Sequence, residues 1–105
     1  NDTYYAGVAK QLKDGANWTA EIPKEEPIAV IPDRTRNGSL LFCHHKGYTI
    51  FDSTQVGQLA TLRSQHIKWL IVLDSQYLHI PEIKENWMVV KTDTAQQRFI
   101  LGKPF

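Results

Sequence analysis

The segment from residue 67 to 74 constrains the fold of this chain more than any other. Its sequence, IKWLIVLD, is a nearly unbroken run of strand-forming apolar side chains that ends at Asp74. A strand with one face in water alternates apolar and polar residues, whereas a continuous run is typical of a strand covered on both faces. The segment 27–33, PIAVIPD, has the same design and ends at Asp33. We therefore expect two parallel strands at the centre of a sheet that helices cover on both sides.

A helix is predicted ahead of the first strand. Apolar residues recur there at helical spacing: Tyr5, Val8, Ala9 and Leu12. Asp14-Gly15 supplies the stop, and the glycine is expected to take the left-handed conformation. The segment 16–26 is polar and reaches Pro27 through Pro23, so we expect a connector without regular structure.

The chain between the two central strands alternates helix and strand. Residues 40–43 are predicted to form a short helix, which we favour over a strand, and residues 48–51 a short strand. Asp52 or Ser53 then caps a helix that ends near residue 66. After Asp74 come a loop or helical turn, a strand over 87–91, a turn and a strand over 98–101. The short turn makes these last two strands an antiparallel hairpin.

This order of elements predicts an α/β fold. Right-handed crossovers place the first strand between the second and the third, and the hairpin extends one edge. The expected architecture is a three-layer, Rossmann-like mixed sheet of about five strands, with a parallel core in the order 2-1-3 plus the C-terminal antiparallel hairpin. Residues 1–105 are predicted to form one domain. Because the chain starts at Asn1 without an initiator Met, we expect it to be a piece of a longer protein.

Composition excludes several classes of function. The net charge of +1 gives no electrostatic case for nucleic acid, and we expect no nucleic-acid partner. A single cysteine forms no internal disulfide. No apolar run approaches the roughly 18–20 residues that span a bilayer.

Polar residues at the strand ends are the candidate ligand-binding groups. Asp33 and Asp74 follow adjacent central strands, where open α/β sheets bind ligands, and two carboxylates there suit the binding of Mg²⁺ or the positioning of a phosphate donor. The simpler interpretation, which we favour, is that each acid caps the turn after its strand. A basic group around residues 34–46 suits a phosphate or an acidic headgroup, but we favour a solvated turn and helix end, because nearby acids keep the net charge near zero. The candidate set is Asp33, Arg34, Asn37, His45, Lys46 and Asp74. No ligand spacing typical of zinc is present, and we predict no metal and no cofactor.

The segment 40–47, LLFCHHKG, resembles the cysteine loop of rhodanese-like sulfurtransferases. Two features would suit such chemistry: a lone cysteine, and neighbouring basic residues that would lower its pKa. The loop lacks the arginine and serine expected near its end, and strand-forming residues 48–51 stand where the next helix should begin. We favour Cys43 as a small buried apolar residue.

A second resemblance rests on three short motifs. Leu40-Leu41-Phe42 takes the place of a Leu-Tyr-Tyr-like segment. The turn 45–48, HKGY, takes the place of an Arg-Lys-Gly-Trp-like turn. Ile67-Lys68-Trp69 takes the place of the approach to a later strand. In this order, over roughly residues 3–92, the chain resembles the small soluble C-terminal domain of polytopic membrane glycosyltransferases related to the dolichyl-phosphate-mannose protein mannosyltransferases.

The resemblance implies a function for the parent protein. Such a parent transfers a sugar from a polyprenyl-phosphate donor, and its catalytic acids lie in membrane loops that this chain lacks, so no catalytic residue is assigned here. The implied domain is non-catalytic, is tethered at the extracytoplasmic (periplasmic) face and helps to recognise the acceptor. Its implied partners are the membrane-embedded part of the same chain and a glycan or lipid-linked sugar. The alternatives are a small sulfurtransferase using Cys43 and a phosphate- or metal-binding α/β module.

Overall fold

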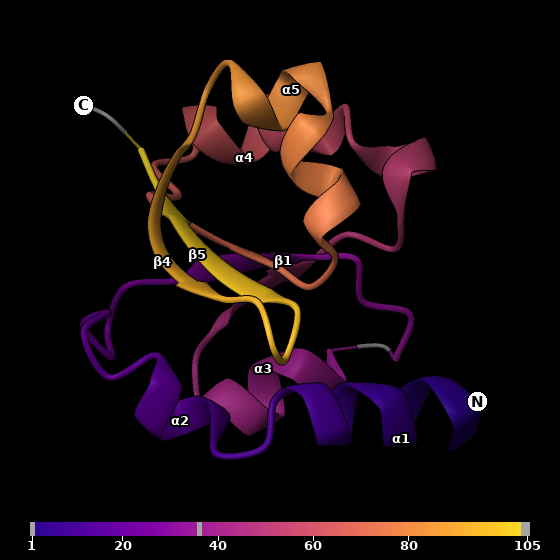
Figure 1. Cartoon of the computed structure of the whole chain (residues 1–105). Helices are drawn as coiled ribbons and strands as arrows, with labels where there is room; N and C mark the ends of the chain where they lie inside the picture. Colours follow the sequence, from indigo (N-terminus) through magenta and orange to yellow (C-terminus); the bar gives the residue numbers. More distant parts are fainter. Residues whose placement is uncertain (1, 36, 104–105) are drawn as a thin grey trace.

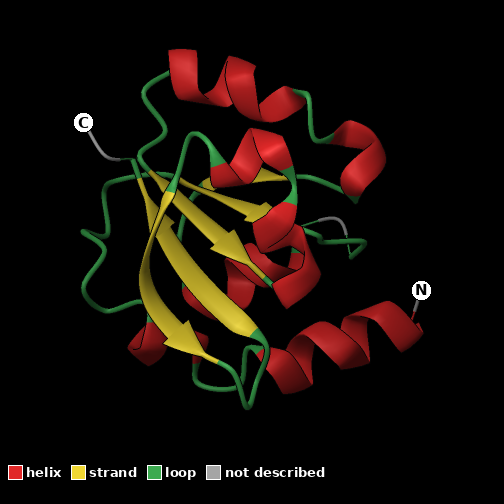
Figure 2. Ribbon diagram, turned by 45° about the horizontal axis from the view of Figure 1, so that its top comes forward, coloured by secondary structure: helices red, strands yellow, loops and turns green. Residues whose placement is uncertain are grey.

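The computed structural model describes residues 2–35 and 37–103, and at its centre is a five-stranded mixed sheet in the order β2-β1-β3-β5-β4 (Figures 1 and 2). The strands along the chain are β1 (Ile28–Ile31), β2 (Gly47–Thr49), β3 (Trp69–Val72), β4 (Met88–Asp93) and β5 (Arg98–Gly102). The α-helices are α1 (Asp2–Gln11), α2 (Gly15–Trp18), α3 (Gly38–Cys43), α4 (Gln58–Ser64) and α5 (Pro81–Lys84). Two 3₁₀ helices complete the set, η1 (Ser53–Gln55) and η2 (Ser75–His79).

The predicted pairing of the two apolar strands is confirmed. β1 and β3 run parallel, with Ile28 opposite Trp69 and Ile31 opposite Val72. β2 pairs in parallel with the other side of β1, which gives the predicted 2-1-3 core. The hairpin is also confirmed, and its place in the sheet is now defined: β5 lies antiparallel beside β3, and β4 forms the outer edge.

Helices cover both faces of the sheet, as the continuous apolar runs predicted. Figure 1 shows α1, α2 and α3 below the sheet and α4 and α5 above it. Alternate residues of β1 enter two separate core clusters: Ala29 and Ile31 pack with the α4 and α5 side, and Ile28 and Val30 pack with the α1 to α3 side. All four side chains are fully buried, so neither face of this strand is in contact with water.

The connector expected over residues 16–26 is wrong at its start. Residues Gly15–Trp18 form α2, and Trp18 is buried against the lower core. The left-handed residue is Asp14, with φ of 60°, rather than Gly15. Glycine is needed at position 15 for another reason: a Cβ there would lie 2.9 Å from the carbonyl oxygen of Phe42. A four-residue helix is too short to produce a recognisable apolar period.

The other helix predictions are confirmed with changed limits. Residues 40–43 lie in α3 and are helical. Asp52 caps the next segment by accepting a hydrogen bond from the Thr54 amide at 2.9 Å, but that segment consists of η1 followed by α4 rather than one helix. The loop or turn expected after Asp74 consists of η2 and α5. None of the helices in the described ranges is long and apolar enough to cross a bilayer.

Candidate functional site

The chain changes direction across the sheet at β1. From β1 it passes through α3 to β2 on one side, and then through α4 to β3 on the other side. The loop after β1 leads to α3 in the lower layer, whereas the loop after β3 leads to η2 and α5 in the upper layer. The two loops therefore diverge at the carboxyl ends of adjacent parallel strands. Open α/β sheets bind their ligands at such a switch point.

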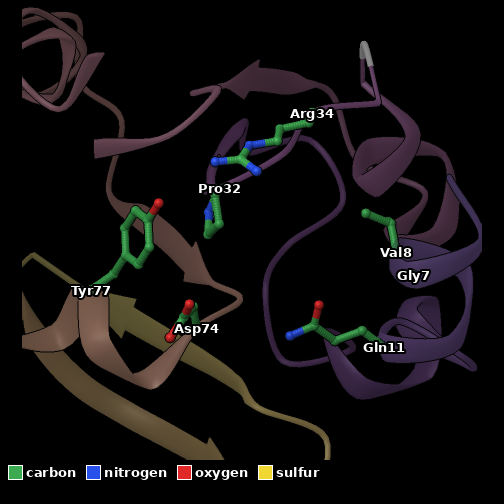
Figure 3. A pocket seen from close by; sticks show the side chains of 7 residues that line it. All are labelled: Gly7, Val8, Gln11, Pro32, Arg34, Asp74 and Tyr77. Atoms are coloured by element: carbon green, nitrogen blue, oxygen red, sulfur yellow. The ribbon is translucent and has the colours of Figure 1, made fainter. Parts of the chain in front are cut away.

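A cavity of about 270 Å³ lies at this switch point. Pro32 and Arg34 line it from the loop after β1, and Asp74 and Tyr77 line it from the segment after β3 (Figure 3). The third wall is α1, which contributes Gly7, Val8 and Gln11. Three segments that are far apart in the sequence thus line one cavity that is open to solvent.

Asp74 presents a carboxylate oxygen to this cavity. Its Oδ1 accepts a hydrogen bond from the Gln76 amide at 2.9 Å, which is the predicted turn cap. Within the described part of the chain, no donor is bonded to Oδ2. Asp74 and Tyr77 are both partly exposed, and Figure 3 shows them together on one side of the cavity. Asp74 therefore caps η2 through Oδ1, as predicted, and binding of a ligand by Oδ2 stays a prediction.

Arg34 and Gln11 complete the polar lining. Nη2 of Arg34 donates to Oδ2 of Asp52 at 3.3 Å, and its guanidinium lies 5.2 Å from the centroid of the Phe51 ring. Nε2 of Gln11 donates to the carbonyl oxygens of Leu73 at 2.5 Å and Gln97 at 2.6 Å. These two bonds occupy both amide hydrogens of Gln11 and leave Oε1 as the acceptor at the cavity.

Asp33 has a different role although it ends the neighbouring strand. It is only 3% exposed. Its Oδ1 accepts from the amide of Thr35 at 2.7 Å and from the Thr35 hydroxyl, and its Oδ2 accepts from the amide of Ser39 at 3.0 Å and from the Ser39 hydroxyl. Four donors therefore saturate the carboxylate, which ties the β1 loop to the first turn of α3. This is the capping role that the sequence analysis favoured.

The remaining three candidates lie away from the cavity. Asn37 is left-handed, with φ of 76°, and its Oδ1 accepts from the Thr49 hydroxyl at 2.8 Å. His45 and Lys46 precede β2, so they lie at the opposite end of the parallel strands from Asp74. The structure thus brings together Arg34 and Asp74 from the predicted set. In the part of the chain that the structure describes, no three His, Cys, Asp or Glu side chains converge as a metal site would need.

Sequence analysis missed Gln11, Tyr77 and Gly7 as lining residues. The apolar stripe of the first helix predicts which face is buried but not which part of the sheet it packs on. Tyr77 lay in a segment without a clear period, so its placement beside Asp74 depends on η2. One weak indication of this lining was present in the sequence: Tyr77 is an aromatic residue that follows closely after the strand-ending Asp74.

Cys43 is fully buried between α2, α3 and the sheet. Burial raises the pKa of its thiol from 9.0 to about 11. Nucleophilic cysteines need the opposite shift, because the thiolate is the reactive form. This environment supports the predicted packing role and disfavours the sulfurtransferase alternative.

Cys43 should therefore react slowly with an alkylating reagent while the chain is folded. With a pKa of about 11, the Cys43 thiol gives about 100-fold less thiolate near neutral pH than an ordinary cysteine does, and burial limits access further. Iodoacetamide labelling followed by mass spectrometry, in buffer and in urea at the same pH, measures this difference. The chain has one cysteine, so the signal reports a single site. Equal rates in the two conditions would contradict the buried, high-pKa thiol.

His45 is buried, and protonation should cost stability. Its Nδ1 lies 3.2 Å from the carbonyl oxygen of Glu26, while its buried Nε2 has no hydrogen-bond partner in the described chain. Burial lowers the pKa of His45 below its usual 6.5, so below about pH 6.5 the unfolded chain binds more protons than the folded chain. The stabilising effect of neutral His45 is complete above that pH and is lost as the pH falls through the folded-state pKa.

We expect His45→Gln to flatten the decline in the free energy of unfolding between pH 7.5 and 5. Urea unfolding at several pH values measures it. The control is His79→Gln, because His79 is exposed on η2, and it should leave the decline as in the wild-type chain. If His45→Gln retains the full pH dependence, another group titrates.

Comparison with known proteins does not extend this description: no family model, curated protein or solved structure matched the chain. The class is therefore defined by the fold and the cavity alone. The chain is a mixed α/β structure with a cavity, lined by polar and apolar side chains, at the switch point between β1 and β3.

Proposed function

We propose that this chain is a non-catalytic domain of a membrane-bound glycosyltransferase and that it helps to recognise the acceptor. The observation that carries the proposal is the cavity at the switch point, which has ligand-type polar groups from three separate segments. The motif order shared with the C-terminal domains of the mannosyltransferase-like enzymes supports the same function. In this proposal the domain lies at the extracytoplasmic face, and its partner is the membrane-embedded part of the same chain.

The chemistry of the site favours binding over catalysis. The residues best suited to react are used for structure: Cys43 has a raised pKa in the core, and four donors saturate Asp33. The cavity itself offers Asp74, Arg34 and an amide oxygen. These groups orient a polar ligand by hydrogen bonds, as a few placed polar groups do in most ligand pockets.

The full-length gene product tests the tether. Several apolar segments of about 20 residues each should precede residues 1–105 in that product, since that length spans a bilayer. A gene product without them refutes the assignment to a membrane enzyme.

Kinetics of the full-length enzyme test the non-catalytic role. Asp74→Asn should raise KM for the acceptor and leave kcat unchanged, because it removes binding that is equal in the ground state and the transition state. The control is Glu82→Gln, since Glu82 is an exposed acid on α5 that does not line the cavity. A fall in kcat with unchanged KM would contradict the proposed role.

A further inference from the structure

The charges around the switch-point cavity are balanced. Among the described residues that line it, Arg34 is the only cation and Asp74 the only anion. The Arg34 guanidinium already donates to Asp52. A phosphate would have to compete with Asp52 for Arg34 and would be repelled by Asp74. Anion sites in proteins instead bring together several cationic side chains or backbone N–H donors. This cavity therefore does not suit a phosphate or a nucleotide.

The hydrogen-bonding groups of the cavity include both donors and acceptors. Oδ2 of Asp74 and Oε1 of Gln11 accept, the Arg34 guanidinium donates, and the Tyr77 hydroxyl can do both. A ligand that fits must therefore donate on one side and accept on the other. Neighbouring hydroxyl groups of a saccharide do this, because each hydroxyl is at once a donor and an acceptor.

The size and the apolar walls limit the ligand further. A volume of about 270 Å³ is just below the range of ligand pockets, which begins at about 300 Å³. It suits one sugar ring rather than a nucleotide or a lipid chain. The Tyr77 ring, Pro32 and Val8 supply apolar contact for the C–H face of such a ring.

We infer that this cavity binds one neutral pyranose ring, as a unit of a glycan. The hydroxyls of the ring bond to Asp74 and Arg34, and its apolar face lies against Tyr77. This inference rests on the proposed function in that it names the ligand class for the same site. It also replaces the phosphate and Mg²⁺ expected from the pair Asp33 and Asp74, since Asp33 does not reach the cavity lining.

Titration of the ¹⁵N-labelled chain tests the inference. The probes are the methyl pyranosides of mannose, glucose and galactose, and separately pyrophosphate with Mg²⁺. We expect at least one glycoside to shift the amide signals of Gln11, Asp74 and Tyr77, with a Kd on the order of 1 mM for a ligand of this size. Pyrophosphate should leave these signals in place.

Two variants separate binding at this site from general effects. Asp74→Asn keeps an oxygen for the Gln76 amide and removes the charged acceptor, so it should weaken glycoside binding about 10-fold or more. Gly7→Phe should abolish binding, because Gly7 lines the cavity and the new ring would fill it. The backbone can accept this side chain, since a Cβ at position 7 meets no atom within 4 Å. Its matched control is Gly57→Phe, where a Cβ also has open space but which does not line the cavity.

Each outcome has a defined meaning. Glycoside shifts that both cavity variants weaken and Gly57→Phe retains support the inference. Shifts with pyrophosphate alone overturn the ligand class but keep the cavity as a binding site, so acceptor recognition through another group would survive. Silence with every probe overturns the binding site itself. The membrane tether is tested separately by the full-length gene product.

Discussion

Asp33→Ala should destabilise the chain by about 3 kcal/mol, although Asp33 contacts no proposed ligand. The variant removes the acceptor of four hydrogen bonds and leaves the donors of Thr35 and Ser39 without it. Because Ser39 is buried at the start of α3, water does not readily replace the carboxylate. Urea unfolding followed by tryptophan fluorescence should give a lower midpoint with an unchanged slope.

Asp74→Ala is the matched comparison, since Asp74 ends the neighbouring parallel strand. One backbone amide bonds to its carboxylate, and the residue is partly exposed. We expect a loss of about 1 kcal/mol in the free energy of unfolding, the usual cost of removing one cap. Equal losses of stability for Asp33→Ala and Asp74→Ala would show that the two acids have the same structural role, which would contradict their different surroundings.

These two acids show where sequence reasoning succeeds and where it ends. Both follow a continuous apolar run, and that pattern alone correctly placed them at adjacent carboxyl ends of a parallel sheet. Whether an acid is saturated or available depends on the next few residues. The Thr35 and Ser39 hydroxyls fold back on Asp33, whereas the segment after Asp74 turns into η2 with one amide bond to the acid. The backbone path after each acid and the hydroxyl side chains that follow Asp33 together decide between the two roles.

The predicted strand order was enough to exclude two candidates, His45 and Lys46, from the site at Asp74. His45 and Lys46 precede a strand that runs parallel to β1, whereas Asp33 follows β1. Residues before and after parallel strands lie at opposite ends of the sheet. The six candidates therefore never belonged to one site, and the strand order was sufficient to predict this.

Contacts between distant segments were beyond the sequence pattern. The stripe on α1 fixed its buried face, but the bonds from Gln11 to Leu73 and Gln97 span 62 and 86 residues. Likewise, hairpin formation was predictable from a short turn, while its placement on β3 depends on which edge of the sheet stays open. Periodicity describes one segment at a time, so it could not predict that α1 forms the third wall of the cavity.

Gly47→Ala is expected to have an effect at least as large as that of Asp33→Ala, because it affects the pairing of β1 with β2. Gly47 begins β2 with φ of 159° and lies opposite Ile28. A Cβ there would overlap the Ile28 carbonyl oxygen and lie 2.8 Å from the carbonyl carbon. These are backbone atoms of a central strand, so they cannot rotate away as a side chain would.

We expect Gly47→Ala to cost about 3 kcal/mol or more in the free energy of unfolding, or to separate β2 from the sheet. Hydrogen exchange distinguishes the two results, because separation would expose the amides of Ile28 and Ile50, which bond to Lys46 and Val30 across this pair. The control is Gly57→Ala, where a Cβ meets nothing within 4 Å and φ is −59°. That variant should be neutral or stabilising by up to about 1 kcal/mol. If Gly47→Ala were as stable as Gly57→Ala with both amides protected, the close approach of β2 to β1 would be wrong.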